Sequence, residues 1–437
     1  MASSTASIGE GAIAAPAVSA PAYKNPFLWV PSSYLTMGLI YVTATTVANI
    51  MFKNMGMDNE QATKWSSNLG WAYVFKPLWA PLLDHWQVPG FARLGQRRGW
   101  LLLAQLGVIA GLIAMALLTP SQLPLFIVAT IAVAFFGATQ DIAVDAWRIE
   151  IAPPNQQGAL VATYSLGYRI ALMAAGAFAL ILADHVRWNW VYLALAAVML
   201  IPVAANLYAR EPVVTHRMPA DWRTAMRYAI ADPFADFFRR YGVVLALVTL
   251  AFLLLFKIPE QATIGGIMGP FYLDMGFSKT QIGAITKVYG IWIGIAGAFA
   301  GGAMVVRWGP WKPLCAMVIL CGSCNLLYLL LIAFPSDPWM LTLVISAENF
   351  TLGMLGPPTV AFLSALVNRE HTATQYALLS SLVNLPGKVL GIFAGGIAMQ
   401  VGYGAYFVIT VLALVPATAL LIWLWPRYRD IGKEGAG

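Results

Sequence analysis

The sequence predicts an all-α integral membrane protein with twelve transmembrane helices in two six-helix halves. The first observation is composition: 59% of the 437 residues are hydrophobic, only 10% are charged, and the mean hydropathy is +0.71. A soluble domain carries about 25% charged residues, so this chain has too little polar surface to face water. The second observation is that the apolar residues form runs of about 20, the length of a membrane-spanning helix. The third is that one long polar stretch divides these runs into two equal sets.

Each predicted helix is an apolar run bounded by polar residues. In the first half the runs cover residues 27–52, 65–84, 100–119, 123–148, 157–183 and 188–208. In the second half they cover residues 242–266, 280–306, 313–334, 338–366, 374–400 and 404–425. We therefore expect a disordered N-terminal tail, a first bundle, a cytoplasmic linker with an amphipathic helix, a second bundle and a C-terminal tail, at residues 1–25, 26–208, 209–241, 242–425 and 426–437.

The basic residues predict the orientation of the chain. Most of them lie in alternate loops and in the linker, which carry Arg93, Arg97, Arg98, Arg210, Arg217, Arg223, Arg227, Arg239, Arg240, Arg307 and Lys312. By the positive-inside rule, these loops and both termini are cytoplasmic. The net charge of +7 is therefore explained by topology and lipid contact, and not by nucleic-acid binding. No basic residue precedes Lys24, so the first residues lack the positive region of a secretory signal.

Cysteine and histidine give no sign of a metal site, a cofactor or an enzyme. The three cysteines share one apolar stretch, and no second cysteine pair or nearby histidine completes a metal-binding set. The histidines are scattered and form no cluster with acidic or nucleophilic residues: His85, His185, His216 and His371. A multi-span membrane enzyme is therefore the less favoured class of function.

A loop motif occurs at the same place in both halves. Ala80-Pro81-Leu82-Leu83-Asp84 is followed by Gly95-Gln96-Arg97-Arg98, and Gly302–Val306 is followed by Arg307-Trp308-Gly309 and Lys312. Both copies resemble the loop signature of the major facilitator superfamily, although Ala80 replaces its glycine and Val306 its aspartate. The resemblance implies a transporter fold of two halves. We expect a gate that closes one face, formed by Asp84, Arg97, Arg98 and Arg148.

Ionisable residues occur inside the predicted spans, where each costs at least ~2.5–3.5 kcal/mol and usually has a function. Five are cations: Lys76, Arg169, Lys257, Lys287 and Lys388. Four are anions: Asp141, Asp145, Glu260 and Glu348. This balance favours an anionic solute, bound by the cations.

The buried carboxylates suit coupling to protons, because proton affinity depends on burial and on the nearest cation. We expect Asp141, Glu348 and Glu260 to include the proton carrier, with Asp145 as the next candidate. Two alternatives remain: Asp145 with Arg148, and Lys257 with Glu260, have helical spacings that also fit structural salt bridges. Glu150, at the end of its span, is expected to be solvated.

Several segments resemble the AmpG family, the muropeptide permeases of Gram-negative inner membranes. They are Ala72–Lys76, Arg97–Leu102, Gln140–Trp147, Leu166–Arg169, Glu348–Asn349 and Ala373–Leu379. The resemblance covers about residues 65–425. It implies proton-driven import of anhydro-muropeptides from periplasm to cytoplasm across the bacterial inner membrane. We expect the protein to be a monomer. It also adds Gln140, Asn349 and Gln375 to the candidate solute-binding residues.

The first span and Lys388, which stands where the family has an arginine, depart from the family pattern. These differences leave a siderophore, or another glycan or oligosaccharide, as the alternative solute.

Overall fold

The computed structural model describes residues 68–152, 154–212, 222–264 and 267–431, and before residue 68 only residues 25, 37–40, 43, 47, 48, 51, 52, 55–57, 61 and 65. Residues 1–24 of the predicted tail, most of the first span, the middle of the linker and the end of the C-terminal tail therefore lie outside the described residues. So do the side chains of Lys287 and Lys388. No strand occurs in the part of the chain that is described.

The first half consists of the segments between residues 71 and 208. The second span is broken into α4 (Trp71–Phe75), the 3₁₀ turn η3 (Lys76–Leu78) and α5 (Ala80–His85), because Pro77 and Pro81 interrupt helical hydrogen bonding. A short turn η4 (Ala92–Leu94) precedes α6 (Gln96–Leu117), and η5 (Pro120–Gln122) precedes α7 (Leu123–Ile151). The half ends with α8 (Pro154–His185), α9 (Trp188–Val198) and α10 (Leu200–Tyr208).

The second half follows α11 (Trp222–Tyr241) and has the same kind of broken spans. The seventh span comprises α12 (Val243–Leu255), α13 (Ile258–Ile264) and α14 (Met268–Asp274), and the eighth comprises α15 (Lys279–Ile282), the π-helix η6 (Gly283–Tyr289) and α16 (Gly290–Trp308). The ninth comprises α17 (Trp311–Ser323), η7 (Cys324–Leu327) and α18 (Tyr328–Ala333). Next come α19 (Pro338–Leu366), η8 (Arg369–His371), α20 (Thr372–Val401), α21 (Tyr403–Leu412) and α22 (Leu414–Tyr428).

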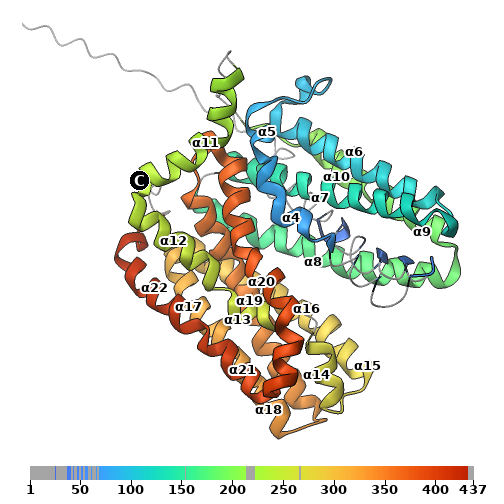
Figure 1. Ribbon diagram of the computed structural model, residues 1–437, viewed down its shortest axis with the longest axis vertical. Coiled ribbons are helices and arrows are strands. Elements are labelled where there is room, and N and C mark those ends of the chain that lie inside the picture. Colours follow the sequence, from blue (N-terminus) through green and yellow to red (C-terminus); the bar gives the residue numbers. More distant parts are fainter. Residues whose placement is uncertain are drawn as a thin grey trace, which may run out of the picture.

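Among the described residues, seven helical segments are long and apolar enough to cross a membrane, or eight if the bent pair Pro338–Leu366 and Arg369–Gly387 is counted as one span. α8, α19 and α20 have 32, 29 and 30 residues, which is also long enough for a span. With these three and the first two spans, which are only partly described, the chain has the predicted twelve helices. Figure 1 shows the first half at the upper right and the second half at the lower left.

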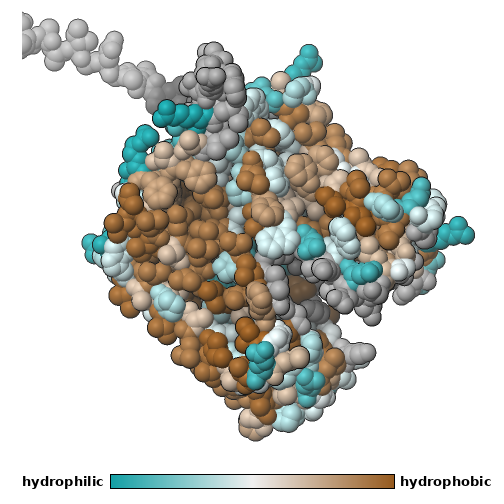
Figure 2. Space-filling view, in the orientation of Figure 1, coloured by the Kyte–Doolittle hydropathy of each residue, from teal (hydrophilic) through white to brown (hydrophobic). Residues whose placement is uncertain are grey.

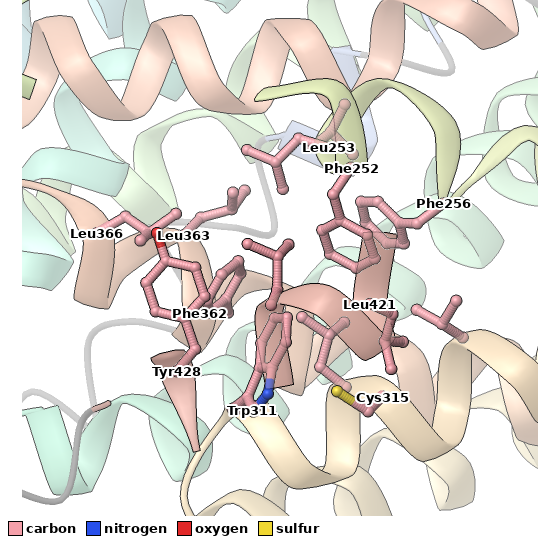
Figure 3. Close-up of a cluster of buried hydrophobic side chains, with 14 of the residues drawn as sticks. Phe252, Leu253, Phe256, Trp311, Cys315, Phe362, Leu363, Leu366, Leu421 and Tyr428 are labelled. Carbon is pink, nitrogen blue, oxygen red and sulfur yellow. The ribbon is translucent and has the colours of Figure 1, made fainter. Parts of the chain in front are cut away.

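Each half has its own apolar core. In the first half, side chains of α6, α7 and α9 pack around Phe126, whose ring lies 5.7 Å from that of Phe52 and 6.0 Å from that of Tyr192. In the second half, α12, α17, α19 and α22 meet at the buried Trp311, 5.4 Å from the ring of Tyr428 (Figure 3). A third cluster, which includes Leu83 and Trp147 of the first half and Ala373 and Ala377 of α20, connects the two halves.

The outside of the molecule is apolar. Leu117, Val128, Val415 and Ile422 are between 62% and 73% exposed, and Figure 2 shows a broad brown surface over the second half. Soluble proteins rarely expose such large apolar areas. This surface requires lipid, as expected of an integral membrane protein.

The halves meet along two helices, α8 of the first half and α20 of the second. α8 packs against α16 and α19, and α20 packs against α4, η3, α5 and α7. Figure 1 shows the upper part of α20 lying beside α4 and α5. Candidate functional residues on these helices therefore lie at or near the interface between the halves.

Candidate functional site

Asp84 joins the two halves at one end of the molecule. It lies at the end of α5, and one carboxylate oxygen accepts hydrogen bonds from Arg97 Nη2 (2.8 Å) and the Ala373 backbone N–H (2.9 Å). The other oxygen accepts bonds from the backbone N–H and the Oγ1 of Thr374, both at 2.7 Å. Ala373 and Thr374 belong to the first turn of α20, whose free N–H groups and dipole favour a negative charge. A carboxylate from the first half thus caps a helix of the second.

Arg97 holds Asp84 in place and is itself held by Glu150. Arg97 Nη2 lies 2.5 Å from Glu150 Oε1, and Nε lies 2.9 Å from Oε2. The side chains of Asp84, Arg97 and Glu150 are 1%, 2% and 8% exposed. The expectation that Glu150 is solvated is therefore wrong. The end of α7 packs against the start of α6, so that the Glu150 carboxylate accepts hydrogen bonds from Nε and Nη2 of the buried Arg97 guanidinium.

Arg98 faces away from this contact. Its guanidinium donates to the carbonyl oxygens of Asn206 (2.8 Å) and Leu207 (2.7 Å) at the end of α10. Glu211 accepts the backbone N–H groups of Arg97 and Arg98 at 2.8 and 3.0 Å, and burial raises the pKa of this carboxyl group. Arg98 therefore stabilises the first half, while Asp84 and Arg97 reach the interface.

Arg148 forms a second contact between the halves. Its guanidinium is fully buried, donates to Gln157 Oε1 (2.5 Å) and Ser364 Oγ (3.3 Å), and lies 3.6 Å from Asp145. It also lies 5.6 Å from the ring centre of Tyr376. Ser364 and Tyr376 belong to α19 and α20, so Arg148 bridges the halves. Its spacing to Asp145 predicted the ion pair but not these partners.

Lys76 and Asp141 form a buried ion pair in the first half. The 3₁₀ turn that Pro77 produces directs Lys76 toward α7, and its Nζ lies 2.5 Å from Asp141 Oδ2. The two side chains are 4% and 16% exposed. Gln140, the neighbouring residue, is fully buried. One candidate solute-binding cation is therefore neutralised by the first-ranked candidate proton carrier.

Arg169 has a different environment. It lies halfway along α8, and a Cβ atom added to Gly294, halfway along the Thr280–Trp308 span, would overlap with its guanidinium. Arg169 therefore reaches the other half through space that only glycine leaves free. None of the ion pairs formed by the described residues includes Arg169.

The candidate residues of the second half fall into two groups. Lys257 lies 3.4 Å from Glu260, and Glu348 interacts electrostatically with the hydroxyl groups of Tyr272 and Tyr328. Asn349 lies one residue beyond Glu348 on α19, and its amide group packs against Gly290 at the start of α16.

Gln375 forms the other group. Its Oε1 accepts from the Asn368 N–H (2.7 Å) and Arg240 (3.0 Å), and its Nε2 donates to the Pro233 carbonyl oxygen and Asp236, both at 2.9 Å. The structure thus places Gln375 beside α11, one residue from the Asp84 contact and apart from the other candidate solute-binding residues.

Two helical halves, buried ionisable residues between them and polar contacts at one end define a membrane transporter, not an enzyme. Residues 30–261 and 251–436 each match the family profile described as Major Facilitator Superfamily. The chain belongs to the major facilitator superfamily and, within it, to the AmpG family.

The relatives support both assignments. The chain is 32% identical over 400 residues to the Rickettsia felis protein named AmpG 4, covering 89% of this chain and 94% of that protein. It is 33% identical over 379 residues to the anhydromuropeptide permease of Escherichia coli K12, covering 86% and 74% of the two chains.

Solved structures show the same fold. The transporter FucP in its outward conformation matches with a TM-score of 0.67 and 13% identity, over 93% of this chain and 99% of that one. The human organic anion transporter MFSD10 also gives a TM-score of 0.67, with 16% identity, over 92% and 100% of the two chains.

Proposed function

We propose that this protein is a proton symporter that imports anhydro-muropeptides from the periplasm to the cytoplasm. In this proposal it acts as a monomer in the bacterial inner membrane, with both termini cytoplasmic. The name of the Escherichia coli relative supports the choice of solute. The observation that carries the proposal is Arg169, a cation in mid-span that points across the interface and belongs to no ion pair of the described residues.

An arginine in the middle of a membrane is costly without a counter-charge. Arg169 therefore suits an anionic group brought by the solute, such as a peptide carboxylate. The remaining solute contacts come from side chains of both halves, so that binding depends on their relative position: Lys76, Gln140, Lys257, Lys287, Asn349 and Lys388. We assign Gln375 to the support of the gate, because its amide is occupied by protein groups.

Proton coupling follows from the Lys76–Asp141 pair. A solute carboxylate that binds Lys76 competes with Asp141, and a carboxylate that loses its cation binds a proton more readily. Binding of solute and proton would then favour each other, as symport requires. Glu348 and Glu260 are the second and third candidate carriers, and Asp145 is the next.

In the proposed cycle of alternating access, the contacts of Asp84 and Arg148 form the gate that closes one side of the solute-binding site. Asp84 and Arg148 join the halves at the end that we propose to be cytoplasmic. Solute then enters from the opposite side, and breaking these contacts releases it.

Uptake into proteoliposomes tests the function. With an inward proton gradient, the full-length protein should concentrate labelled anhydro-muropeptide, and collapse of the gradient should stop accumulation. Arg169→Gln should weaken uptake, whereas Arg427→Gln, which removes an exposed arginine stacked on Trp423, should not.

A ferric siderophore and an unrelated oligosaccharide are assayed in parallel. Accumulation of either one in place of the anhydro-muropeptide would contradict the proposed solute while preserving the transport mechanism. Accumulation that ignores the proton gradient would contradict symport.

A further inference from the structure

The linker helix α11 binds the segment of the second half that receives Asp84. This segment, residues 366–375, comprises the end of α19, η8 and the start of α20. Ala373 and Thr374 within it donate their backbone N–H groups to the Asp84 carboxylate. α11 packs against α20 and also against α5, which carries Asp84 (Figure 1). The linker helix therefore lies next to both partners of the contact that joins the halves.

Asp236 connects α11 to the 366–375 segment at two places. Its Oδ2 accepts hydrogen bonds from Gln375 Nε2 and Arg240 Nε, both at 2.9 Å, and its Oδ1 accepts one from Asn368 Nδ2 at 3.3 Å. Burial raises the pKa of Asp236, but the hydrogen bond from Gln375, the charge of Arg240 and the hydrogen bond from Asn368 together bring it below its usual value. The contacts thus favour the ionised carboxylate, which accepts hydrogen bonds at both oxygens.

Three further groups of α11 bind the same segment. The Pro233 carbonyl oxygen accepts a hydrogen bond from Gln375 Nε2 at 2.9 Å. Arg240 Nη2 donates to Gln375 Oε1 at 3.0 Å and to the Leu366 carbonyl oxygen at 3.2 Å, and the Tyr241 hydroxyl donates to the same carbonyl oxygen at 3.2 Å. Gln375 directly follows the two residues that bind Asp84, so this network fixes the direction in which their N–H groups point.

We propose that Asp236 is a positioning residue of the gate: by holding Asn368 and Gln375, it keeps the N–H groups at the start of α20 directed at Asp84. This inference rests on the proposed function, because it assumes that the Asp84 contact closes one side of the solute-binding site. It adds the linker helix to a gate whose other residues lie in the two bundles. Closure at this end then requires α11 to be bound to the 366–375 segment.

Electron–electron double resonance on the full-length protein in lipid vesicles measures the ratio of closed to open states. Spin labels replace Arg93, between α5 and α6, and Lys312, at the start of α17, which are both exposed. Asp236→Asn keeps the size of the side chain but replaces one oxygen by a donor group, so that Asn368 or Gln375 loses its acceptor. The closed-to-open ratio should fall about three- to tenfold, as expected for one hydrogen bond of a partly exposed side chain.

Asn368→Asp tests the same contact from the other side. An aspartate can still accept the Glu370 N–H, which Asn368 binds at 3.1 Å, but it places a second carboxylate against Asp236. This variant should also lower the closed-to-open ratio. Combining it with Asp236→Asn again pairs a donor with an acceptor, so the double variant should recover most of the original ratio. A double variant that is as open as the two single variants would overturn the proposed contact.

Asp232→Asn is the matched control, because it removes the same charge one turn earlier on α11, where the carboxylate lies 4.0 Å from the exposed Arg227. It should leave the ratio unchanged, and a fall equal to that of Asp236→Asn would overturn the proposal by attributing the effect to the charge of the helix. If Asp84→Asn lowers the ratio and Asp236→Asn does not, the gate stands and this inference fails. If neither variant lowers the ratio, the proposed gate fails and the inference fails with it. The measurement requires no solute and no proton gradient, so it does not depend on the solute or the coupling proposed above.

Discussion

Lys76 and Arg169 show two ways to keep a cation inside a membrane. Lys76 has a carboxylate at 2.5 Å, whereas Arg169 lies against Gly294 and is in no ion pair of the described residues. Since an uncompensated charge is costly, the two residues require different things of the solute. In the proposed mechanism, Lys76 exchanges the Asp141 carboxylate for an anionic group of the solute, whereas Arg169 receives an anionic partner for the first time when the solute binds.

The first prediction concerns the space beside Arg169. Gly294→Ala adds a Cβ atom that overlaps with the guanidinium, so Arg169 must move away from the position where we propose that it binds solute. A hydrogen bond to a charged group contributes ~1.5–3 kcal/mol, so solute affinity should fall about 10–100-fold. Binding is measured by calorimetry on purified protein.

Gly356→Ala is the matched control, because a Cβ atom there meets nothing within 4 Å. Equal affinities for both variants would contradict the assignment of Arg169 as a solute ligand.

The second prediction concerns the proton carrier. Asp141→Asn removes the proton-binding group, so accumulation against the solute gradient should stop. Exchange of solute between the two sides should continue, because exchange requires no net proton movement. Uphill uptake and counterflow are compared in the same proteoliposomes.

Glu348→Gln, Glu260→Gln and Asp145→Asn are assayed in turn. If Asp141→Asn still concentrates solute, the variant that loses accumulation and keeps exchange identifies the carrier. If all four variants concentrate solute, none of these carboxylates is the carrier.

At the scale of elements, the first turn of α20 is the part of the second half that Asp84 binds, and we propose that this contact breaks when the gate opens. The third prediction is that Asp84→Asn shifts the protein toward the state open at this end. The change weakens charge-assisted hydrogen bonds to α20 and leaves Arg97 without one of its two carboxylates. At ~1.5–3 kcal/mol per such bond, the closed-to-open ratio should fall about 10–100-fold. Distances between spin labels on the two halves measure this ratio.

Asp337→Asn provides the control. Asp337 also caps a helix, accepting the Trp339 N–H at 2.8 Å, but it does so within one half. An unchanged distance distribution for Asp84→Asn would reduce Asp84 to the same local role.

The helices were predictable and their long-range partners were not. Apolar runs and loop residues located α19 at residues 338–366, as found, and the loop motif indicated Asp84 and Arg97. The burial of Glu150, the Lys76–Asp141 pair and the partners of Gln375 depend on contacts between segments far apart in sequence. Helical spacing carries information about neighbours on one helix only, so these contacts required the structure.

At the scale of the whole molecule, the basic residues of the loops and the linker predict the orientation of the chain in the membrane. The fourth prediction is that single cysteines at Arg223 and Arg429 react only from the cytoplasmic side. Cysteine at Trp339, which is 80% exposed at the start of α19, should react only from the opposite side. The native cysteines are buried, so they give a low background. Reaction of Arg223→Cys or Arg429→Cys from the periplasm would reverse the proposed direction of import.

The contact between Asp84 and α20 has a consequence for how such proteins can diverge. Two of the groups that Asp84 binds on the second half are backbone N–H groups, and only the hydroxyl of Thr374 is a side chain. Every helix offers free N–H groups in its first turn, whatever its sequence. The second half can therefore accumulate substitutions without losing its contact with Asp84. A hybrid protein that joins the first half of this chain to the second half of a distant relative should still form the closed state at this end.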